Sequence, residues 1–244
     1  QLVAKSPGDG YTLLLHASSL VINPLLYKSP GYDAFADFTP ISLVFDYKLM
    51  VVVHPSVPAK NAKDLIAIAK ARPGELRHGS TGIGSGFHLA GELFKKMAGV
   101  DLLHIPYRGG VPAIQDMVAG TCDMMFGNMP EFLGQIAGGG LVPVAFGSSR
   151  PSPLLPNVPT IAQTLPGFSV VNWFGVIGPK GLSAAQIAFW DGELAKLAQS
   201  DEWKKYLAEH QLESDYRPSR ETKQFLDTEY VEYKTILGEL GLAK

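Results

Sequence analysis

The stretch of this chain that carries the most information reads His78-Gly79-Ser80-Thr81-Gly82-Ile83-Gly84-Ser85-Gly86-Phe87-His88-Leu89-Ala90-Gly91-Glu92. A short turn with glycines and three hydroxyl side chains leads directly into a helical pattern. Such a turn exposes main-chain N–H groups at the positive end of a helix dipole, so it is suited to holding an anion. No side chain near it is suited to breaking a bond. The sequence therefore predicts first a binder of small carboxylates.

This turn does not match the common nucleotide-binding motifs. No Gly-Lys-Ser/Thr follows it, so it is not a Walker loop, and Phe87 stands where the third glycine of a dinucleotide fingerprint belongs. The alternative interpretation is a glycine turn that only reverses the chain. We predict that hydroxyl or amide groups of the turn bind the anion and that its glycines let the backbone approach closely. The predicted binding residues are Ser80, Thr81, Gly82, Gly84 and Ser85.

Composition and charge exclude several classes of protein. The 244 residues, 46% apolar and 18% charged, are typical of a globular chain that forms one large domain or two lobes. A net charge of −2 without a basic stripe argues against nucleic acid as a partner. No apolar run approaches the roughly 18 residues that cross a bilayer. The single cysteine, Cys122, excludes an internal disulfide, and we expect it to be a small buried side chain.

Apolar extended segments alternate with helical patterns, which predicts an α/β fold. Three successive predicted strands are each followed by a glycine-containing turn and a helix, and ligands gather at the carboxyl ends of such parallel strands. The second and third turns add four candidates, namely Tyr107, Gly109, Gly110 and Asn128. Asn128 is equally well explained as a helix cap. We expect Arg108 to be an exposed loop charge.

Two extended segments, Leu49–Val53 and Val170–Ile177, bracket the middle third of the chain. If both cross between lobes, residues 1–52 and 170–244 form lobe 1 and residues 53–169 form lobe 2. Each lobe then has its own central sheet. Two crossing strands make a hinge that permits closure around a ligand.

Four further residues have two interpretations each. Ser18 and Ser19 follow an extended segment and are predicted to face the ligand from lobe 1. Trp173 is predicted as a wall of the pocket, although an aromatic residue in a hinge strand is more often part of the core. Asp46 is predicted as a solvated loop acid or, if it faces the ligand, as a partner for an ammonium group.

Several motifs in the right order give the chain a resemblance to a known family. It resembles the solute receptors of tripartite tricarboxylate transporters, the Bug-type periplasmic binding proteins. The matching stretches are Pro7-Gly8-Asp9-Gly10-Tyr11-Thr12-Leu13-Leu14, Asn23-Pro24-Leu25-Leu26-Tyr27, Asp37-Phe38-Thr39-Pro40, Gly84-Ser85-Gly86-Phe87-His88-Leu89-Ala90, His104-Ile105-Pro106-Tyr107-Arg108-Gly109, Leu155-Pro156-Asn157-Val158-Pro159-Thr160 and Trp173-Phe174-Gly175.

The resemblance implies a two-lobed receptor of the type II periplasmic-binding-protein kind. Such a receptor closes on a small organic carboxylate and delivers it to the membrane subunits of its transporter. It is expected to be periplasmic, monomeric and without a cofactor. Members of the family begin with a strand and a proline-glycine-glycine loop that contacts the ligand. Because nothing similar precedes Gln1, we expect an N-terminally incomplete chain whose export signal is also absent.

Two other classes of function are weaker predictions. An enzyme acting on a small carboxylic acid needs a nucleophile, a metal set or paired acids, and the six histidines have no metal-binding spacing. No Gly-x-Ser-x-Gly nucleophile elbow is present either. We therefore predict no catalytic residue and no metal site. The remaining alternative is a cytoplasmic carboxylate-binding sensor or regulator, which would need a DNA-binding or signalling segment.

Overall fold

The computed structural model describes residues 1–148 and 150–243, so Lys244, the last residue of the predicted lobe 1, lies outside it. The described chain forms two compact units. Unit 1 comprises residues 1–46 and 173–244, and unit 2 comprises residues 47–172. The chain thus passes twice between the units, after Asp46 and after Asn172.

These boundaries differ from those expected from the sequence. The segment Leu49–Val53 pairs with two strands of unit 2, so residues 49–52 belong to that unit rather than to lobe 1. At the second crossing, the N–H of Val170 donates to the carbonyl of Gly147, which holds residue 170 in unit 2 as well.

Unit 2 contains a five-stranded sheet with the order β5-β4-β6-β3-β7. The strands β4, β5 and β6 run parallel to one another, whereas β3 is antiparallel to both of its neighbours. Their bounds are Leu49–Val53 (β3), Arg77–Ser80 (β4), Leu103–Pro106 (β5), Met124–Asn128 (β6) and Val142–Phe146 (β7).

The strand β3, which lies between β6 and β7, is apolar throughout, and all five of its residues are buried. Its alternate side chains enter two separate cores, because successive residues of a strand face opposite sides of the sheet. Leu49, Val51 and Val53 pack with side chains of α2 and α3. Met50 and Val52 pack with side chains of α4 and α5. The bounds of these helices are Ala62–Ala71 (α2), Gly86–Ala98 (α3), Gly110–Val118 (α4) and Met129–Ala137 (α5), and a short helix, η2, spans Ile161–Gln163.

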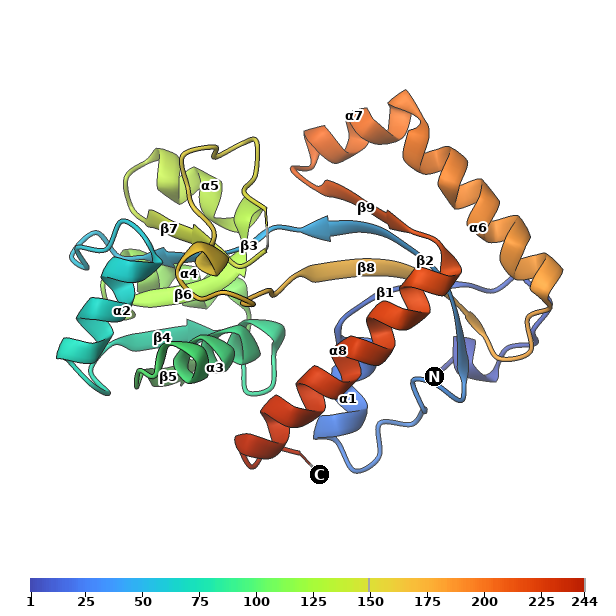
Figure 1. Ribbon diagram of the computed structural model, residues 1–244, viewed down its shortest axis with the longest axis horizontal. Helices are drawn as coiled ribbons and strands as arrows, with labels where there is room; N and C mark the ends of the chain where they lie inside the picture. The colour runs from blue at the N-terminus through green and yellow to red at the C-terminus, as the bar shows by residue number, and fades with distance from the viewer. Residues whose placement is uncertain (149, 244) are drawn as a thin grey trace. The chain divides into compact units, whose positions relative to one another are not determined.

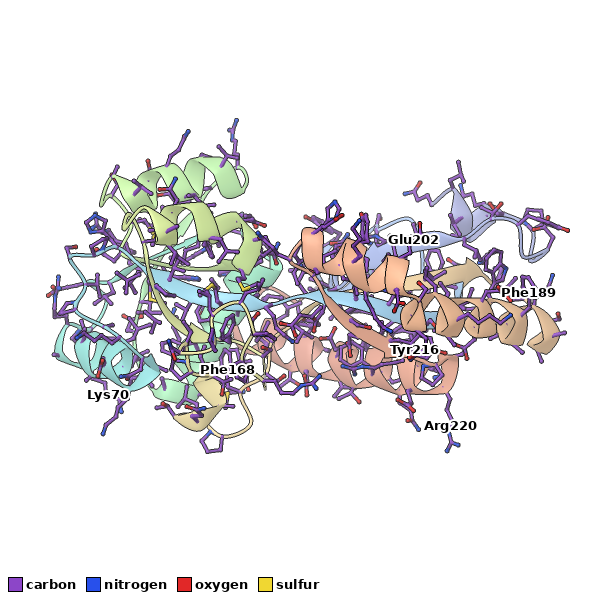
Figure 2. All side chains as sticks on the ribbon, turned by 90° about the horizontal axis from the view of Figure 1, so that it is seen from above. Lys70, Phe168, Phe189, Glu202, Tyr216 and Arg220 are labelled. Carbon is purple, nitrogen blue, oxygen red and sulfur yellow. The ribbon has the colours of Figure 1, made fainter. Side chains whose placement is uncertain are left out.

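Helices therefore cover both faces of this sheet (Figure 1). Phe168 lies in the interior of the unit, whereas Lys70 projects outward from α2 (Figure 2). Cys122 is buried, as its apolar setting predicts, and burial raises the pKa of its thiol to about 11. Unit 2 thus has the α/β architecture that the alternating pattern predicts.

Unit 1 contains a four-stranded sheet with the order β1-β8-β2-β9. Within the unit, α1 packs against α8, and α6 and α7 run beside β9 (Figure 1). The strands are Leu14–Ala17 (β1), Phe38–Tyr47 (β2), Asn172–Pro179 (β8) and Glu213–Arg217 (β9). The helices are Val3–Lys5 (η1), Ser19–Leu26 (α1), Ala184–Gln199 (α6), Asp201–Glu209 (α7) and Ser219–Glu239 (α8). None of the described helices is both long enough and apolar enough to span a bilayer.

Candidate carboxylate site

Three strand-to-helix junctions of unit 2 lie at the same edge of its sheet. The parallel strands β5, β4 and β6 are neighbours in that order, so their carboxyl ends point the same way. Each strand is followed by a helix that begins at Gly86, Gly110 or Met129. The predicted candidates of unit 2 are therefore gathered at one edge, where the amino ends of α3, α4 and α5 also lie.

The first junction, between β4 and α3, is held largely by its own chain. Ser80 is fully buried, and its hydroxyl accepts from the N–H of Gly82 at 3.1 Å. The same oxygen lies 2.6 Å from His104 Nε2. The N–H of Gly84 donates to His88 Nδ1 at 3.0 Å. Ser80 and the N–H groups of both glycines are thus used inside the protein, and their role is to shape the turn.

Other donors of this junction remain available to a ligand. Ser85 is the residue before α3, and its hydroxyl accepts from the N–H of His88 at 3.2 Å. Within the described part of the chain, no acceptor reaches the N–H groups of Gly86 and Phe87, and the Thr81 hydroxyl has no partner. Sequence reasoning did not single out Gly86 and Phe87. Their position directly after a capping serine is a signal for unsatisfied first-turn N–H groups.

The second junction, between β5 and α4, starts at a glycine that no other residue replaces easily. Gly109 has a φ of 120°, a conformation that side-chain-bearing residues rarely adopt. No side chain caps α4, and the N–H groups of Gly110 and Val111 have no partner among residues 1–148 and 150–243. Pro112 has no N–H to offer. This helix therefore begins with two unsatisfied donors.

Tyr107 belongs to the same junction, but its hydroxyl is already used. It donates to Asp116 Oδ2 at 2.8 Å, and burial together with this bond raises the pKa of Tyr107. Arg108 is exposed, as predicted.

At the third junction, between β6 and α5, hydrogen bonds link three polar side chains. Asn128 Nδ2 donates to Glu131 Oε1 at 2.7 Å, and Asn128 Oδ1 accepts from Asn172 Nδ2 at 3.1 Å. The Asn128 side chain does not cap α5. The N–H of Met129 donates to the carbonyl of Lys48, and Pro130 lacks an N–H. The Asn128 amide is therefore committed to its neighbours rather than open to an anion.

Several histidines lie beneath the first two junctions without adding charge. The rings of His88 and His104 stack with their centroids 4.0 Å apart, and His78 lies 5.6 Å from His104. Burial lowers the pKa of His78 to about 3 and that of His104 to about 4. Both rings are thus neutral at pH 7. The positive potential of the site comes from main-chain dipoles.

The candidates of unit 1 are described separately. Ser18 and Ser19 lie at the start of α1, and their hydroxyls have no partner among the described residues. Trp173 is fully buried and donates its Nε1–H to Glu229 inside the unit, so it lies in the core. The expectation of a solvated loop acid at Asp46 is wrong, because Asp46 is 5% exposed and lies in β2. No group of three His, Cys, Asp or Glu residues within the described ranges is arranged to hold a metal ion.

Two α/β units joined by two chain crossings have the architecture of the periplasmic binding proteins. The chain belongs to the tripartite tricarboxylate transporter receptor family, whose model matches residues 1–242. This confirms the family that the sequence motifs indicate.

Curated relatives agree with this membership. BugT of Bordetella pertussis (strain Tohama I) is 38% identical over 200 residues, which are 81% of this chain and 61% of BugT. A UPF0065 protein from the tcbD–tcbE intergenic region of Pseudomonas sp. (strain P51) is 36% identical over 197 residues, which are 80% of this chain and 59% of that protein. The chain thus spans about 60% of the length of these relatives.

Solved structures share the fold over nearly the whole chain. An R. palustris protein solved with adipate has a TM-score of 0.84 at 30% identity, covering 99% of this chain and 82% of that protein. The periplasmic binding protein BugD has a TM-score of 0.78 at 27% identity, again covering 99% and 82%.

Proposed function

We propose that this chain is part of an extracytoplasmic receptor that binds a small organic carboxylate and delivers it to the membrane subunits of a tripartite tricarboxylate-type transporter. One observation carries the proposal: in the part of the chain that the structure describes, no acceptor reaches the N–H groups of Gly86 and Phe87 at the start of α3 or those of Gly110 and Val111 at the start of α4. Family membership and the adipate-bound relative support the same chemistry.

The number of these donors suits a transport receptor. A hydrogen bond to a charged group contributes about 1.5–3 kcal/mol, so four of them supply about 6–12 kcal/mol before the cost of immobilising the ligand. Micromolar affinity requires about 8 kcal/mol. Main-chain donors, helped by the Thr81 hydroxyl, therefore supply a large share of the free energy of binding without an arginine clamp.

The proposed receptor acts in a particular compartment and does not modify its ligand. The receptor works in the periplasm as a monomer, and its partners are the carboxylate and the transporter's membrane subunits. It acts without catalysis, because Ser80, whose Oγ lies 2.6 Å from His104 Nε2, is fully buried and also accepts from the N–H of Gly82, which keeps a substrate from its hydroxyl. Turnover of a carboxylic acid by the purified protein would contradict this.

A single main-chain donor can be removed without touching any side chain. Gly86 is the first residue of α3, where proline is tolerated because its missing N–H makes no helical bond. The preceding Ser85 has φ −67° and ψ 156°, which suits a residue before proline. Ala184 offers a matched control, since it begins α6 after Ser183 with φ −70° and ψ 156°.

We expect Gly86→Pro to weaken carboxylate binding at least tenfold, the loss that one charge-assisted hydrogen bond implies, and Ala184→Pro to leave it unchanged. Binding is measured by calorimetry with linear dicarboxylates, adipate among them, on the complete reading frame that contains this chain. Equal affinity of the two variants and the parent protein would show that α3 does not hold the carboxylate.

A further inference from the structure

An acidic side chain stands among the donors of the proposed carboxylate site. Glu131 is the third residue of α5, and it is exposed. Its Oε1 accepts from Asn128, while its Oε2 lies 3.1 Å from the point where a Cβ atom on Gly110 would stand. One carboxylate therefore reaches from the start of α5 to the start of α4.

Two hydrogen bonds fix the orientation of the Glu131 carboxylate. Asn172 donates to Asn128 Oδ1, which leaves Asn128 Nδ2 directed at Glu131. Both hydrogen bonds form in only one of the two orientations of the Asn128 amide, because its oxygen must accept from Asn172 while its nitrogen donates to Glu131. Three side chains in a row thus hold the acid over the amino end of α4.

Glu131 has no partner of opposite charge among the described residues. No lysine, arginine or histidine there forms an ion pair with it, and this includes the exposed Arg108, which precedes Gly109 and Gly110. Desolvation by the surrounding protein raises the pKa of the Glu131 carboxyl, and the hydrogen bond from Asn128 opposes this shift.

The three helix starts are consequently not equivalent. Neither α3 nor α4 has an acid in its own first turn. However, Glu131 of α5 reaches the start of α4. The α3 junction therefore attracts a ligand carboxylate more strongly, because Glu131 offsets part of the positive potential at the start of α4 and favours a positively charged group there.

We propose that Glu131 is a specificity-determining residue that selects ligands carrying an ammonium group together with their carboxylate. In this arrangement the α3 junction holds the carboxylate and Glu131 pairs with the ammonium group. The ligand class is then an amino-acid-like zwitterion rather than a plain dicarboxylate. This inference rests on the proposed carboxylate-receptor function and narrows its ligand.

Pairs of acids that differ only by an ammonium group test the inference. Succinate and aspartate form one pair, and glutarate and glutamate form another. Calorimetry measures the affinity of each for the complete reading frame. We expect the aminated member to bind at least tenfold more tightly than its partner, as a charge-assisted hydrogen bond implies.

Two variants separate recognition from a structural role. Glu131→Gln keeps an acceptor and the shape of the side chain, and we expect it to abolish or reverse the preference within each pair. Glu221→Gln removes an exposed acid from the first turn of α8 and serves as the control that keeps the preference. A purely structural role of Glu131 would lower the melting temperature without changing the ratio of affinities.

The outcomes are distinguishable. Tight binding of plain dicarboxylates with no effect of Glu131→Gln on the ratio would overturn the selection of ammonium groups and leave the receptor function standing. Failure of all four acids to bind a folded parent protein would count against the receptor function itself, and the inference would fall with it. A preference lost in Glu131→Gln and kept in Glu221→Gln supports both.

Discussion

The indole N–H of Trp173 donates to the carboxyl group of Glu229, which lies 56 residues further along the chain and inside the same unit. Trp173 is the first residue of unit 1 after the second crossing. Desolvation raises the pKa of Glu229 to about 8, so this carboxyl group is protonated at neutral pH in the folded protein. The pair anchors the crossing strand β8 to α8.

The first prediction concerns the stability of the protein between about pH 4.5 and pH 8. Unfolded Glu229 ionises above its ordinary pKa of 4.5, whereas the folded protein keeps the proton up to about pH 8. Raising the pH through this window therefore favours unfolding, by about 1.4 kcal/mol per pH unit. We expect Glu229→Gln to remove this slope and to stabilise the protein at pH 7.

Urea unfolding followed by tryptophan fluorescence at several pH values measures this effect. The exposed Glu232 on the same helix provides the control, and Glu232→Gln should retain the slope. An unchanged pH dependence in Glu229→Gln would contradict a protonated Glu229.

A second prediction has the opposite sign. His78 is fully buried, its two ring nitrogens have no partner in the described part of the chain, and burial lowers its pKa to about 3. Unfolded histidine takes up a proton below about 6.5, so acidification from pH 6.5 towards 3 favours unfolding by about 1.4 kcal/mol per pH unit from this residue. His78→Leu removes an unsatisfied polar group and should lose less stability in acid.

Circular dichroism melts between pH 7 and pH 4 test this expectation. The exposed His210 supplies the comparison, because His210→Leu should leave the acid slope as it is. If His78→Leu loses stability as steeply as the parent, the acid sensitivity arises elsewhere.

A third prediction separates two neighbouring hydroxyls. Ser80→Ala leaves the Gly82 N–H and His104 Nε2 without their bonds and should destabilise the protein by about 1–3 kcal/mol. Thr81→Ala removes a hydroxyl that has no partner among the described residues, so it should weaken carboxylate binding while stability stays the same. Thermal melts and calorimetry on both variants decide the matter; loss of binding only in Ser80→Ala would reverse these roles.

The positions of the three junctions follow from the sequence, but the free donors do not. Glycines and prolines after short apolar segments indicate where β5 and β6 end, and the glycine-rich turn marks the end of the polar strand β4. The buried β3 is visible as a continuous apolar run. Which N–H groups are used inside the protein depends on partners distant in sequence. Ser80 meets His104, 24 residues away, and Asn172 meets Asn128, 44 residues away. A pattern along a single sequence does not reveal which distant residues form such pairs.

Trp173 shows the same limit in another way. Its sequence setting allows either a pocket wall or a core position, and both fit an apolar strand. The structure places it in the core because α8 brings Glu229 beneath it, and α8 begins more than forty residues later. The sequence does not single out Glu131, because acids are common in the first turn of a helix. Only its proximity to Gly110 in the structure indicates a role in ligand recognition.

Proline residues stand in the first turns of α4 and α5, at Pro112 and Pro130. Each deletes one N–H that an anion would otherwise meet at a helix start. Fewer donors shorten the residence time of the cargo, since differences in affinity among related complexes appear mainly in the dissociation rate. In the receptor that we propose, a short residence time favours release of the ligand within each transport cycle.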